Sequence, residues 1–128
     1  MAESSAYDGR EPMVRTVAMP ADANANGDIF GGWVLSQMDI AGGVCAGRVA
    51  KGRTTTVAVE AMAFHKPIEI GDLVSVYAEV SRIGRTSIAV RVETVATRQD
   101  SAEEVKVTEG TFIYVAIDNA GRPRSVAR

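Results

Sequence analysis

The chain has 128 residues and a nearly balanced charge, with 16 acidic side chains against 14 lysines and arginines. That balance, without a run of Lys or Arg, argues against nucleic-acid binding by neutralisation of phosphates. Apolar residues make up 46% of the chain, which excludes extended disorder and predicts a folded core.

Three features of the sequence bear on the cellular location of the protein. Residues 1–12 are mostly small and polar, and we interpret them as a flexible leader rather than a signal peptide. The stretch poorest in charge, residues 29–47, still contains Asp39 and several glycines, so we expect no membrane insertion. Because Cys45 is the single cysteine, no intrachain disulfide is possible, and this fits a reducing compartment. We therefore expect a cytoplasmic protein.

One domain is expected over residues 13–124, followed by a short tail at 125–128. It starts with a strand-like run at residues 13–19, which Pro20 ends because proline cannot donate a ladder hydrogen bond. Residues 21–28, with the sequence ADANANGD, concentrate turn-forming side chains and lead into a helix.

The helix is predicted over residues 31–50. Its apolar stripe has helical steps of three and four and consists of Leu35, Met38, Gly42, Cys45 and Val49. The opposite side is also apolar, so we expect the helix to be buried nearly all round. The stripe and its neighbours contain glycines, each of which costs about 1 kcal/mol relative to alanine inside a helix. Close packing against the helix backbone would offset that cost.

From residue 53 onward the hydrophobic period is two, which predicts strands. Four long strands are expected, at residues 54–64, 73–83, 87–98 and 105–117. Gly84-Arg85-Thr86 is typical of a tight hairpin connection. Together these elements predict an α+β fold in which an antiparallel sheet of about five strands wraps round one long central helix.

A sheet of this size needs more cover than one helix provides. A helix is about 10 Å wide, whereas five strands lie about 4.8 Å apart. Strands with Val or Ile on both faces, such as residues 87–98, therefore predict burial against a second copy, with the two sheets joined edge to edge.

Most standard catalytic sets are missing from the sequence. One histidine and one cysteine cannot form a zinc site by themselves, and no phosphate loop, dinucleotide fingerprint or nucleophile elbow is present. His65 is either a general base or a packing residue at a strand end. Cys45 lies in the apolar stripe of the helix and is interpreted as part of the core.

The run from Asn24 to Gly32, followed by Asp39 in the middle of an apolar helix, is the strongest candidate for chemistry. Free N–H groups at the start of a helix stabilise negative charge, and glycine lets a substrate approach them. Gly31 and Gly32 are thus a candidate oxyanion hole. A buried carboxylate is costly without a partner or a task, so Asp39 is either functional or in a salt bridge.

The same region closely resembles the YciA-type acyl-CoA thioesterases of the hotdog fold. The resemblance starts at AMPADANANGDIFGG and extends over residues 13–124 through FHKP, IGD, GRTSI and YVAID. It implies hydrolysis of acyl-CoA to the free acid and CoA without a metal or other cofactor. It also implies a homodimer as the catalytic unit and a hexamer made of three dimers.

The resemblance assigns roles to individual residues. Asp39 matches the catalytic carboxylate, and Gly31 and Gly32 match the backbone that polarises the thioester carbonyl. Asp28 matches a second polar catalytic position, although it is also suited to cap the helix. Since sites of this fold form between subunits, Asp39 is expected to face the glycine turn of the partner.

CoA carries several phosphates, so local positive charge is required. Arg85, Thr86 and Ser87 match a CoA-contacting segment of the family and offer a guanidinium and two hydroxyls. Further candidates for CoA binding are Lys66, Arg82 and Arg122, with Arg124 in the same basic tail.

Several readings of the chemistry stay open. Asp39 either deprotonates a water or attacks the thioester itself through a mixed anhydride. The alternatives to a thioesterase are a hydroxyacyl-thioester dehydratase, a non-catalytic acyl-CoA sensor and a purely structural oligomer. A dehydratase generally needs a histidine in the site, and no histidine lies near Asp28 or Asp39 in the sequence.

Overall fold

The structure, a computed structural model, describes residues 10–126. The expected leader at residues 1–12 lies outside this range except for its last three residues. Six main elements follow the predicted order, and their bounds differ from the predicted ones by few residues. These elements are β1 (Val14–Val17), α1 (Gly31–Ala50), β2 (Thr54–Phe64), β3 (Leu73–Ile83), β4 (Ser87–Thr97) and β5 (Glu104–Ala116). A short 3-10 helix at Pro20–Asp22 was not predicted.

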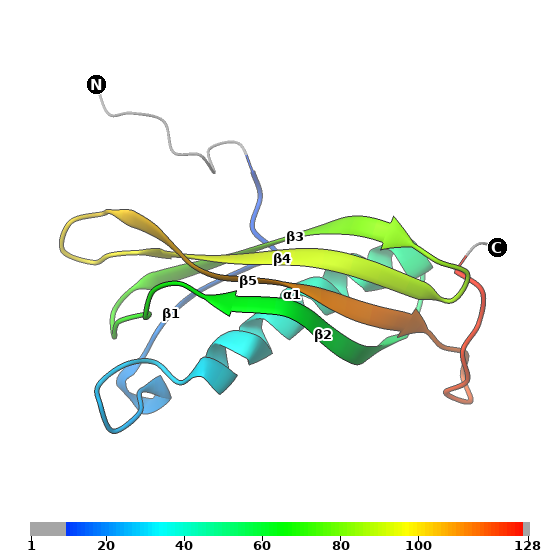
Figure 1. The fold of residues 1–128 in the computed structure, drawn as a ribbon, viewed down its shortest axis with the longest axis horizontal. Helices are drawn as coiled ribbons and strands as arrows, with labels where there is room; N and C mark the ends of the chain where they lie inside the picture. The colour runs from blue at the N-terminus through cyan, green and yellow to red at the C-terminus, as the bar shows by residue number, and fades with distance from the viewer. Residues whose placement is uncertain (1–9, 127–128) are drawn as a thin grey trace.

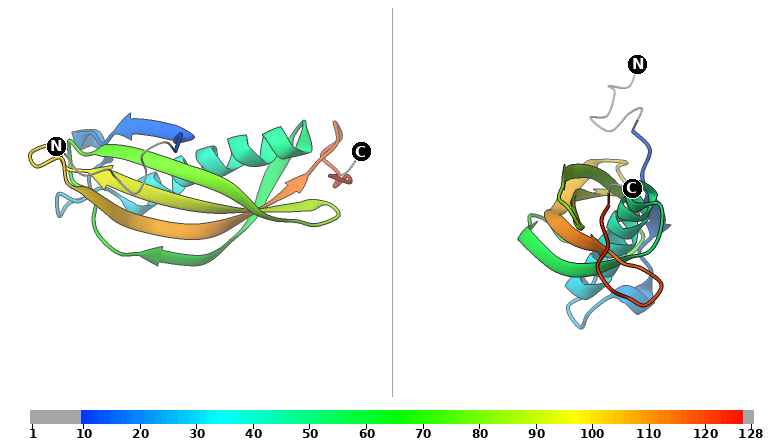
Figure 2. Two further views of the ribbon diagram at one scale, coloured as in Figure 1. Left: turned by 90° about the horizontal axis from the view of Figure 1, so that it is seen from above. Right: turned by 90° about the vertical axis from the view of Figure 1, so that its right-hand side faces the viewer.

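The five strands form one antiparallel sheet with the order β1-β3-β4-β5-β2. The sheet curves along α1 on one side, and both views of the ribbon show the helix lying in its concave face (Figures 1 and 2). This arrangement confirms the predicted fold class, an antiparallel sheet wrapped round one long helix. Within residues 10–126, no helix is long and apolar enough to cross a membrane.

The core lies between α1 and the concave face of the sheet. Met38 of α1, Val90 of β4 and Phe112 of β5 are all almost fully buried there. The alternation of strand residues explains this, since every second side chain points to the helix. Val126 is also buried in this core, so residue 126 of the expected tail packs against the domain.

The expectation that β4 is buried by a second copy is wrong. β4 is the central strand of the sheet, and Val90 and Val95 are already 0% and 1% exposed within the protomer. Hydrophobic period shows that both faces of a strand are buried, but it does not show which strand lies at the edge. The edges belong to β1, which is four residues long, and to the longer β2, where Val57 and Val59 are 55% and 42% exposed.

The expectation that α1 is buried nearly all round is also wrong for the protomer. Ile40 and Val44 are exposed, because the sheet covers only one side of the helix. These two residues and the exposed valines of β2 are apolar side chains that the protomer leaves uncovered, and we refer to them jointly as the α1–β2 surface. A second copy of the chain is therefore expected to cover the α1–β2 surface, and not β4 as the sequence had indicated.

Candidate active site

Asp39 lies in the middle of α1, on the side of the helix that faces β2 and β5. Its Oδ1 accepts a hydrogen bond of 2.7 Å from Thr56 Oγ1 and one of 2.9 Å from Tyr114 Oη. Both donors are neutral hydroxyls, so they hold the carboxylate without cancelling its charge. The salt bridge considered as the alternative role of Asp39 is not found within residues 10–126.

Tyr114 is buried on β5 and its hydroxyl points to α1. The oxygen lies 3.1 Å from the main-chain oxygen of Asp39 as well as 2.9 Å from the carboxylate. Burial, followed by the hydrogen bond and the negative charge of Asp39, raises the pKa of Tyr114 far above its ordinary value. The hydroxyl therefore stays protonated and remains a donor to the carboxylate.

Gly42 creates the space that Tyr114 occupies. A Cβ at Gly42 would collide with Tyr114 Oη, whereas one at Gly43 would meet the ring only at 3.8 Å and one at Gly47 only the main chain of Gly52 at 3.6 Å. The expected close packing against the helix backbone is therefore found at Gly42, where Tyr114 leaves no room for a side chain, and not at Gly43 or Gly47.

The carboxylate opens on a cavity of about 240 Å³ between α1 and the sheet. Gly32 and Leu35 line it from the first turns of α1, and Thr56, Val59 and Phe112 line it from the sheet. Asp39 Oδ2 has no hydrogen-bond partner within residues 10–126. One oxygen of Asp39 is thus fixed and the other is left for a ligand or a water.

The loop before α1 is organised by Asn24. Its Oδ1 accepts hydrogen bonds from the N–H groups of Asn26 (2.9 Å) and Asp28 (3.2 Å), and Gly27 between them has a positive φ of 86°. The helix is capped by Phe30, without a side-chain cap. The alternative role of Asp28 as an N-cap is therefore wrong, because the helix starts at Gly31, three residues later, beyond the reach of that side chain.

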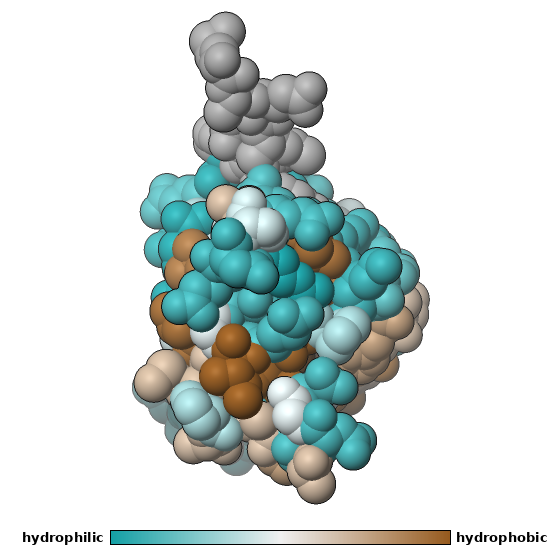
Figure 3. All heavy atoms as spheres, turned by 90° about the vertical axis from the view of Figure 1, so that its left-hand side faces the viewer, coloured by the Kyte–Doolittle hydropathy of each residue, from teal (hydrophilic) through white to brown (hydrophobic). Residues whose placement is uncertain are grey.

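Gly31 and Gly32 occupy the first two positions of α1. Their N–H groups have no acceptor within residues 10–126, and both glycines are exposed. This end of the molecule is mainly hydrophilic with a hydrophobic patch (Figure 3), and the exposed aromatic rings of Phe30 and Phe64 lie near the glycines. Two free amide donors are available here for an oxyanion.

One protomer does not bring these donors to Asp39. Gly32 and Asp39 are seven residues apart on the same helix, which is about 10 Å along the axis. Helix N–H groups point toward the N-terminus, away from Asp39. An oxygen bound at the glycines therefore lies beyond the reach of the carboxylate. Asp28 does not line the Asp39 cavity either.

The candidate CoA-binding residues divide into two groups. The N–H of Lys66 bonds to Val107 at one end of β5, whereas the N–H of Ala116 at the other end bonds to the Thr86 carbonyl. Val107 and Ala116 are nine positions apart along β5, which corresponds to about 30 Å. Arg85, Thr86 and Ser87 lie in the β3–β4 hairpin, with Arg82 just before it, and Arg122 lies in the loop after β5. Lys66 is thus remote from the other candidates within a protomer.

His65 and Cys45 do not line the Asp39 cavity. His65 Nε2 lies 2.8 Å from Glu109 Oε2, and Glu109 is also paired with Arg91 and Lys106. This ion-pair cluster lies on the face of the sheet opposite α1, because the neighbours of Arg91, Val90 and Val92, point into the core. Burial raises the pKa of the Cys45 thiol, which agrees with its interpretation as a core residue.

Sequence reasoning missed Thr56 and Tyr114. Thr56 was one of three consecutive threonines, and nothing in the pattern distinguished it. Tyr114 gave a stronger signal, since it is a polar-tipped ring at an inward position of an apolar strand. Its relation to Gly42 depends on how β5 crosses the helix, which the hydrophobic period does not describe.

Comparisons with known proteins place this geometry in a family. Residues 26–102 match the thioesterase superfamily. The acyl-CoA thioester hydrolase YciA of Salmonella typhimurium is 50% identical over 117 residues, which are 89% of this chain and 88% of that protein. This chain belongs to the thioesterase superfamily. The YciA protein of Escherichia coli K12 is 47% identical over 117 residues, with 89% of each chain covered. The resemblance to YciA-type hydrolases is thereby confirmed.

Solved structures of other thioesterases share the fold of this chain. A hexameric thioesterase from Yersinia pestis has a TM-score of 0.88 and 47% identity, and the match covers 94% of this chain and 98% of that one. A hexameric hotdog-fold thioesterase of Campylobacter jejuni has a TM-score of 0.89 and 39% identity, with coverage of 94% and 92%. The predicted hotdog fold is confirmed.

Proposed function

We propose that this protein hydrolyses acyl-CoA to a free carboxylic acid and CoA, with Asp39 as the catalytic carboxylate. The observation that carries the proposal is the environment of Asp39, which is held by two hydroxyls, has no cationic partner within residues 10–126 and opens on a cavity of about 240 Å³. The names of the relatives, acyl-CoA thioester hydrolases, support the substrate class.

In the proposed mechanism Asp39 acts as a general base. Thr56 and Tyr114 fix Oδ1, and Oδ2 accepts a proton from a water that attacks the thioester carbonyl. The resulting oxyanion is stabilised by backbone N–H groups, and the carbon–sulfur bond then breaks. The proton taken by Asp39 is returned to the departing CoA thiolate.

A second route is direct attack by Asp39, which forms a mixed anhydride that water then hydrolyses. Trapping with hydroxylamine during turnover distinguishes the two routes, because an anhydride converts Asp39 to a hydroxamate and a general base does not. In a single turnover in ¹⁸O-labelled water, label in the Asp39 carboxylate would also show the anhydride, hydrolysed at the Asp39 carbonyl, whereas label in the product acid is expected for water attack on the acyl carbonyl by either route.

The proposed oxyanion hole is formed by Gly31 and Gly32 of a second subunit. The spacing along α1 supports this, because the glycines and the carboxylate of one helix are about 10 Å apart, too far to contact one carbonyl. Asp28, exposed and three residues before Gly31, is then a candidate for contact with the substrate from the same partner loop.

The catalytic unit is accordingly a homodimer. The α1–β2 surface supports it, since its side chains are apolar, it flanks the Asp39 cavity through Val59, and it includes the longer of the two edge strands of the sheet. Pairing of β2 with β2 of a second copy would satisfy that edge and bury the surface. The hexameric assemblies of relatives support three such dimers per molecule.

The proposed reaction uses a water, a carboxylate and backbone amides, so it needs no metal or cofactor. Within residues 10–126 no cluster of three or more His, Cys, Asp or Glu side chains is suited to hold a metal. The cytoplasmic location stays a prediction.

The experiment that tests this function is a hydrolysis profile over acyl-CoA substrates from short to long chains, with free thiol as the readout. We expect release of thiol with a preference for some chain lengths. Saturable binding without thiol would indicate a sensor, and a change in ultraviolet absorbance without thiol would indicate a dehydratase. Neither binding nor hydrolysis would indicate a structural oligomer. The position of His65 on the other face of the sheet disfavours the dehydratase.

A further inference from the structure

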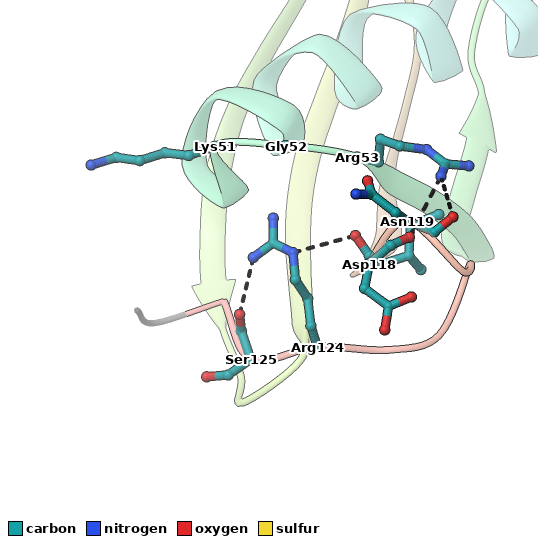
Figure 4. A pocket seen from close by; sticks show the side chains of 8 residues that line it. Lys51, Gly52, Arg53, Asp118, Asn119, Arg124 and Ser125 are labelled. Atoms are coloured by element: carbon teal, nitrogen blue, oxygen red, sulfur yellow. Dashed lines mark hydrogen bonds between the residues drawn. The ribbon is translucent and has the colours of Figure 1, made fainter.

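A larger cavity than the one at Asp39, of about 550 Å³, lies at the C-terminal end of α1. Both arginines that line it are bonded to main-chain carbonyls (Figure 4). The guanidinium of Arg124 donates to Ile117 at 3.3 Å and to Ser125 at 3.1 Å, and that of Arg53 donates to Asp118 at 3.5 Å. The arginine side chains of this cavity therefore hold the chain segments around it together.

The cavity at Asp39 contains a hydroxyl that has no such partner. Ser36 of α1 lines this cavity together with Asp39 and Thr56. The hydroxyl of Thr56 donates to Asp39, whereas that of Ser36 makes no hydrogen bond to any of residues 10–126. A serine inside a helix can donate to the carbonyl three or four residues earlier, here that of Trp33 or Gly32. Ser36 does not do so, and its hydroxyl is left for a molecule in the cavity.

The fold itself does not require a hydroxyl at position 36. Ser36 is exposed in the protomer and is not part of the hydrophobic core. Alanine forms helices more readily than serine, because the serine hydroxyl competes for main-chain hydrogen bonds. An alanine at this position would therefore suit the helix better, and a task in the cavity explains the serine.

Ser36 and Asp39 are spaced to share one water molecule. Residues three apart on a helix are neighbours on its surface, with Cβ atoms about 5–6 Å apart. Helical side chains lean toward the N-terminus, so the longer side chain of Asp39 extends toward the turn that holds Ser36. A water with two hydrogen bonds of about 2.8 Å spans up to about 5.6 Å. One water therefore fits between Asp39 Oδ2, which is unpaired within residues 10–126, and Ser36 Oγ.

The contacts of Asp39 come from two directions. Thr56 and Tyr114 reach Oδ1 from β2 and β5, whereas Ser36 lies one turn away along α1 itself. A water held only by Asp39 can rotate about that hydrogen bond. A second contact at Ser36 fixes its orientation before the reaction starts, which lowers the entropy cost of reaching the transition state.

We propose that Ser36 is a catalytic residue that holds the attacking water together with Asp39. The inference rests on the proposed function in its general-base form. The water donates one hydrogen to Asp39 Oδ2 and the other to Ser36 Oγ, which leaves a lone pair of the water oxygen for the thioester carbon. As the carbon–oxygen bond forms, the first hydrogen passes to Asp39 as a proton. The second stays on the oxygen that becomes part of the product acid, and the carbon–sulfur bond breaks as Asp39 returns its proton to the thiolate.

Steady-state hydrolysis is the first test. It compares wild type, Ser36→Ala, Ser36→Thr and the matched control Gln37→Ala, since Gln37 is the next polar residue of α1 and does not line the cavity. For Ser36→Ala we expect kcat to fall about tenfold with KM unchanged, as for loss of one hydrogen bond in the transition state. Ser36→Thr keeps the hydroxyl and should stay within about threefold of wild type. Gln37→Ala should match wild type.

Methanol as a competing nucleophile is the second test. Methanol has one O–H hydrogen, which goes to Asp39, and its methyl group replaces the hydrogen that Ser36 would accept. Ser36→Ala should therefore slow hydrolysis but not methanolysis, and the ratio of methyl ester to free acid should rise about tenfold. The melting temperature of Ser36→Ala should equal or exceed that of wild type, because alanine favours the helix.

Three results would overturn the role of Ser36. The first is a wild-type kcat for Ser36→Ala, and the second is an equal loss of hydrolysis and methanolysis, which would leave the product ratio unchanged. The third is a fall in melting temperature that accompanies the loss of activity, since it would indicate a structural role. A wild type that releases no thiol would instead overturn the proposed function, and this inference with it. Thiol release by wild type and equal release by Ser36→Ala would overturn this inference alone.

Discussion

Asp39 and Asp72 are two carboxylates placed in opposite ways. Asp72 is 2% exposed, and its Oδ2 accepts hydrogen bonds from Arg98 at 2.5 Å and from the N–H of Glu69 at 2.8 Å. Its charge is neutralised by a guanidinium, and it joins the turn before β3 to the end of β4. Asp39 instead has two neutral donors and an open cavity. A paired charge stabilises the fold, whereas an unpaired and oriented charge is available for chemistry.

Asp39→Asn should have the largest effect of any single change at the proposed site. The amide keeps the shape of the side chain but cannot act as a base, so turnover should fall about 10²- to 10⁴-fold. Thermal stability, oligomeric state and affinity for CoA should stay close to wild type. Steady-state hydrolysis and CoA titration measure these quantities, and hydrolysis near the wild-type rate would reject the role of Asp39.

Asp72→Asn should show the reverse pattern. Removal of the Asp72 charge leaves the partly buried Arg98 with only the more distant Glu69, at 3.6 Å, as counter-charge, and loss of this charged hydrogen bond should cost about 1.5–3 kcal/mol of unfolding free energy. The turnover per folded molecule should change little. Denaturant unfolding and active-site-normalised hydrolysis measure the two effects. A large loss of turnover with intact stability would show that the contrast between the two carboxylates is drawn wrongly.

Gly42→Ala tests the packing that holds Asp39. The added methyl group displaces the Tyr114 hydroxyl, and overpacking of this kind costs about 1–3 kcal/mol. In a Tyr114→Phe background the cost of the same methyl should be smaller, because the hydroxyl that it would meet is gone. A double-mutant cycle of unfolding free energies measures this coupling. Additive effects would mean that Gly42 does not accommodate Tyr114.

Tyr114→Phe tests the protonation of the hydroxyl through its effect on stability. The pKa of Tyr114 is raised in the folded protein, while the unfolded chain releases this proton at about pH 10. The contribution of Tyr114 is therefore fully present below pH 10. Above it, wild type should lose about 1.4 kcal/mol more stability per pH unit than Tyr114→Phe. Parallel stability curves for the two proteins above pH 10 would contradict the protonated hydroxyl.

The sequence was sufficient for most of the fold and for less of the site. The change from a helical to a two-residue period at residues 51–53 placed α1 and the long strands within few residues of their bounds. It did not place β4 at the centre or β2 at the edge, because period carries no information about strand order. The expectation that a second copy covers residues 87–98 was wrong for that reason, whereas the joining of two sheets edge to edge stays a prediction.

At the site, Asp39 was conspicuous because a charge in an apolar helix is rare, and Gly31 and Gly32 because they open that helix. Thr56 and Tyr114 were not found, since their role depends on contacts between α1, β2 and β5. Asp28 could not be separated from a helix cap, because the hydrophobic period does not show which residue immediately precedes the first turn. Local pattern thus identifies an unusual residue, while its partners depend on tertiary packing.

The central claim is that Asp39 of one subunit works with the glycine amides of another. Gly31→Pro removes one of these N–H groups, and proline suits the first helical position after Phe30, whose ψ is 134°. Gly31→Ala is its matched control, because it keeps the N–H and its Cβ would lie 3.8 Å from the Phe64 ring. We expect a loss of about 10²- to 10³-fold for the proline variant and little for the alanine variant.

The most direct measurement is hydrolysis by mixed oligomers of Asp39→Asn and Gly31→Pro, co-expressed with different affinity tags and purified through both. Each variant alone should be nearly inactive. If the site is shared, each mixed dimer contains one intact pair of Asp39 and Gly31 and should recover about half of the wild-type rate per dimer, while any dimers of a single variant in the same hexamer stay inactive. Mixed oligomers as inactive as their parents would show that both groups act within one subunit and would contradict the account.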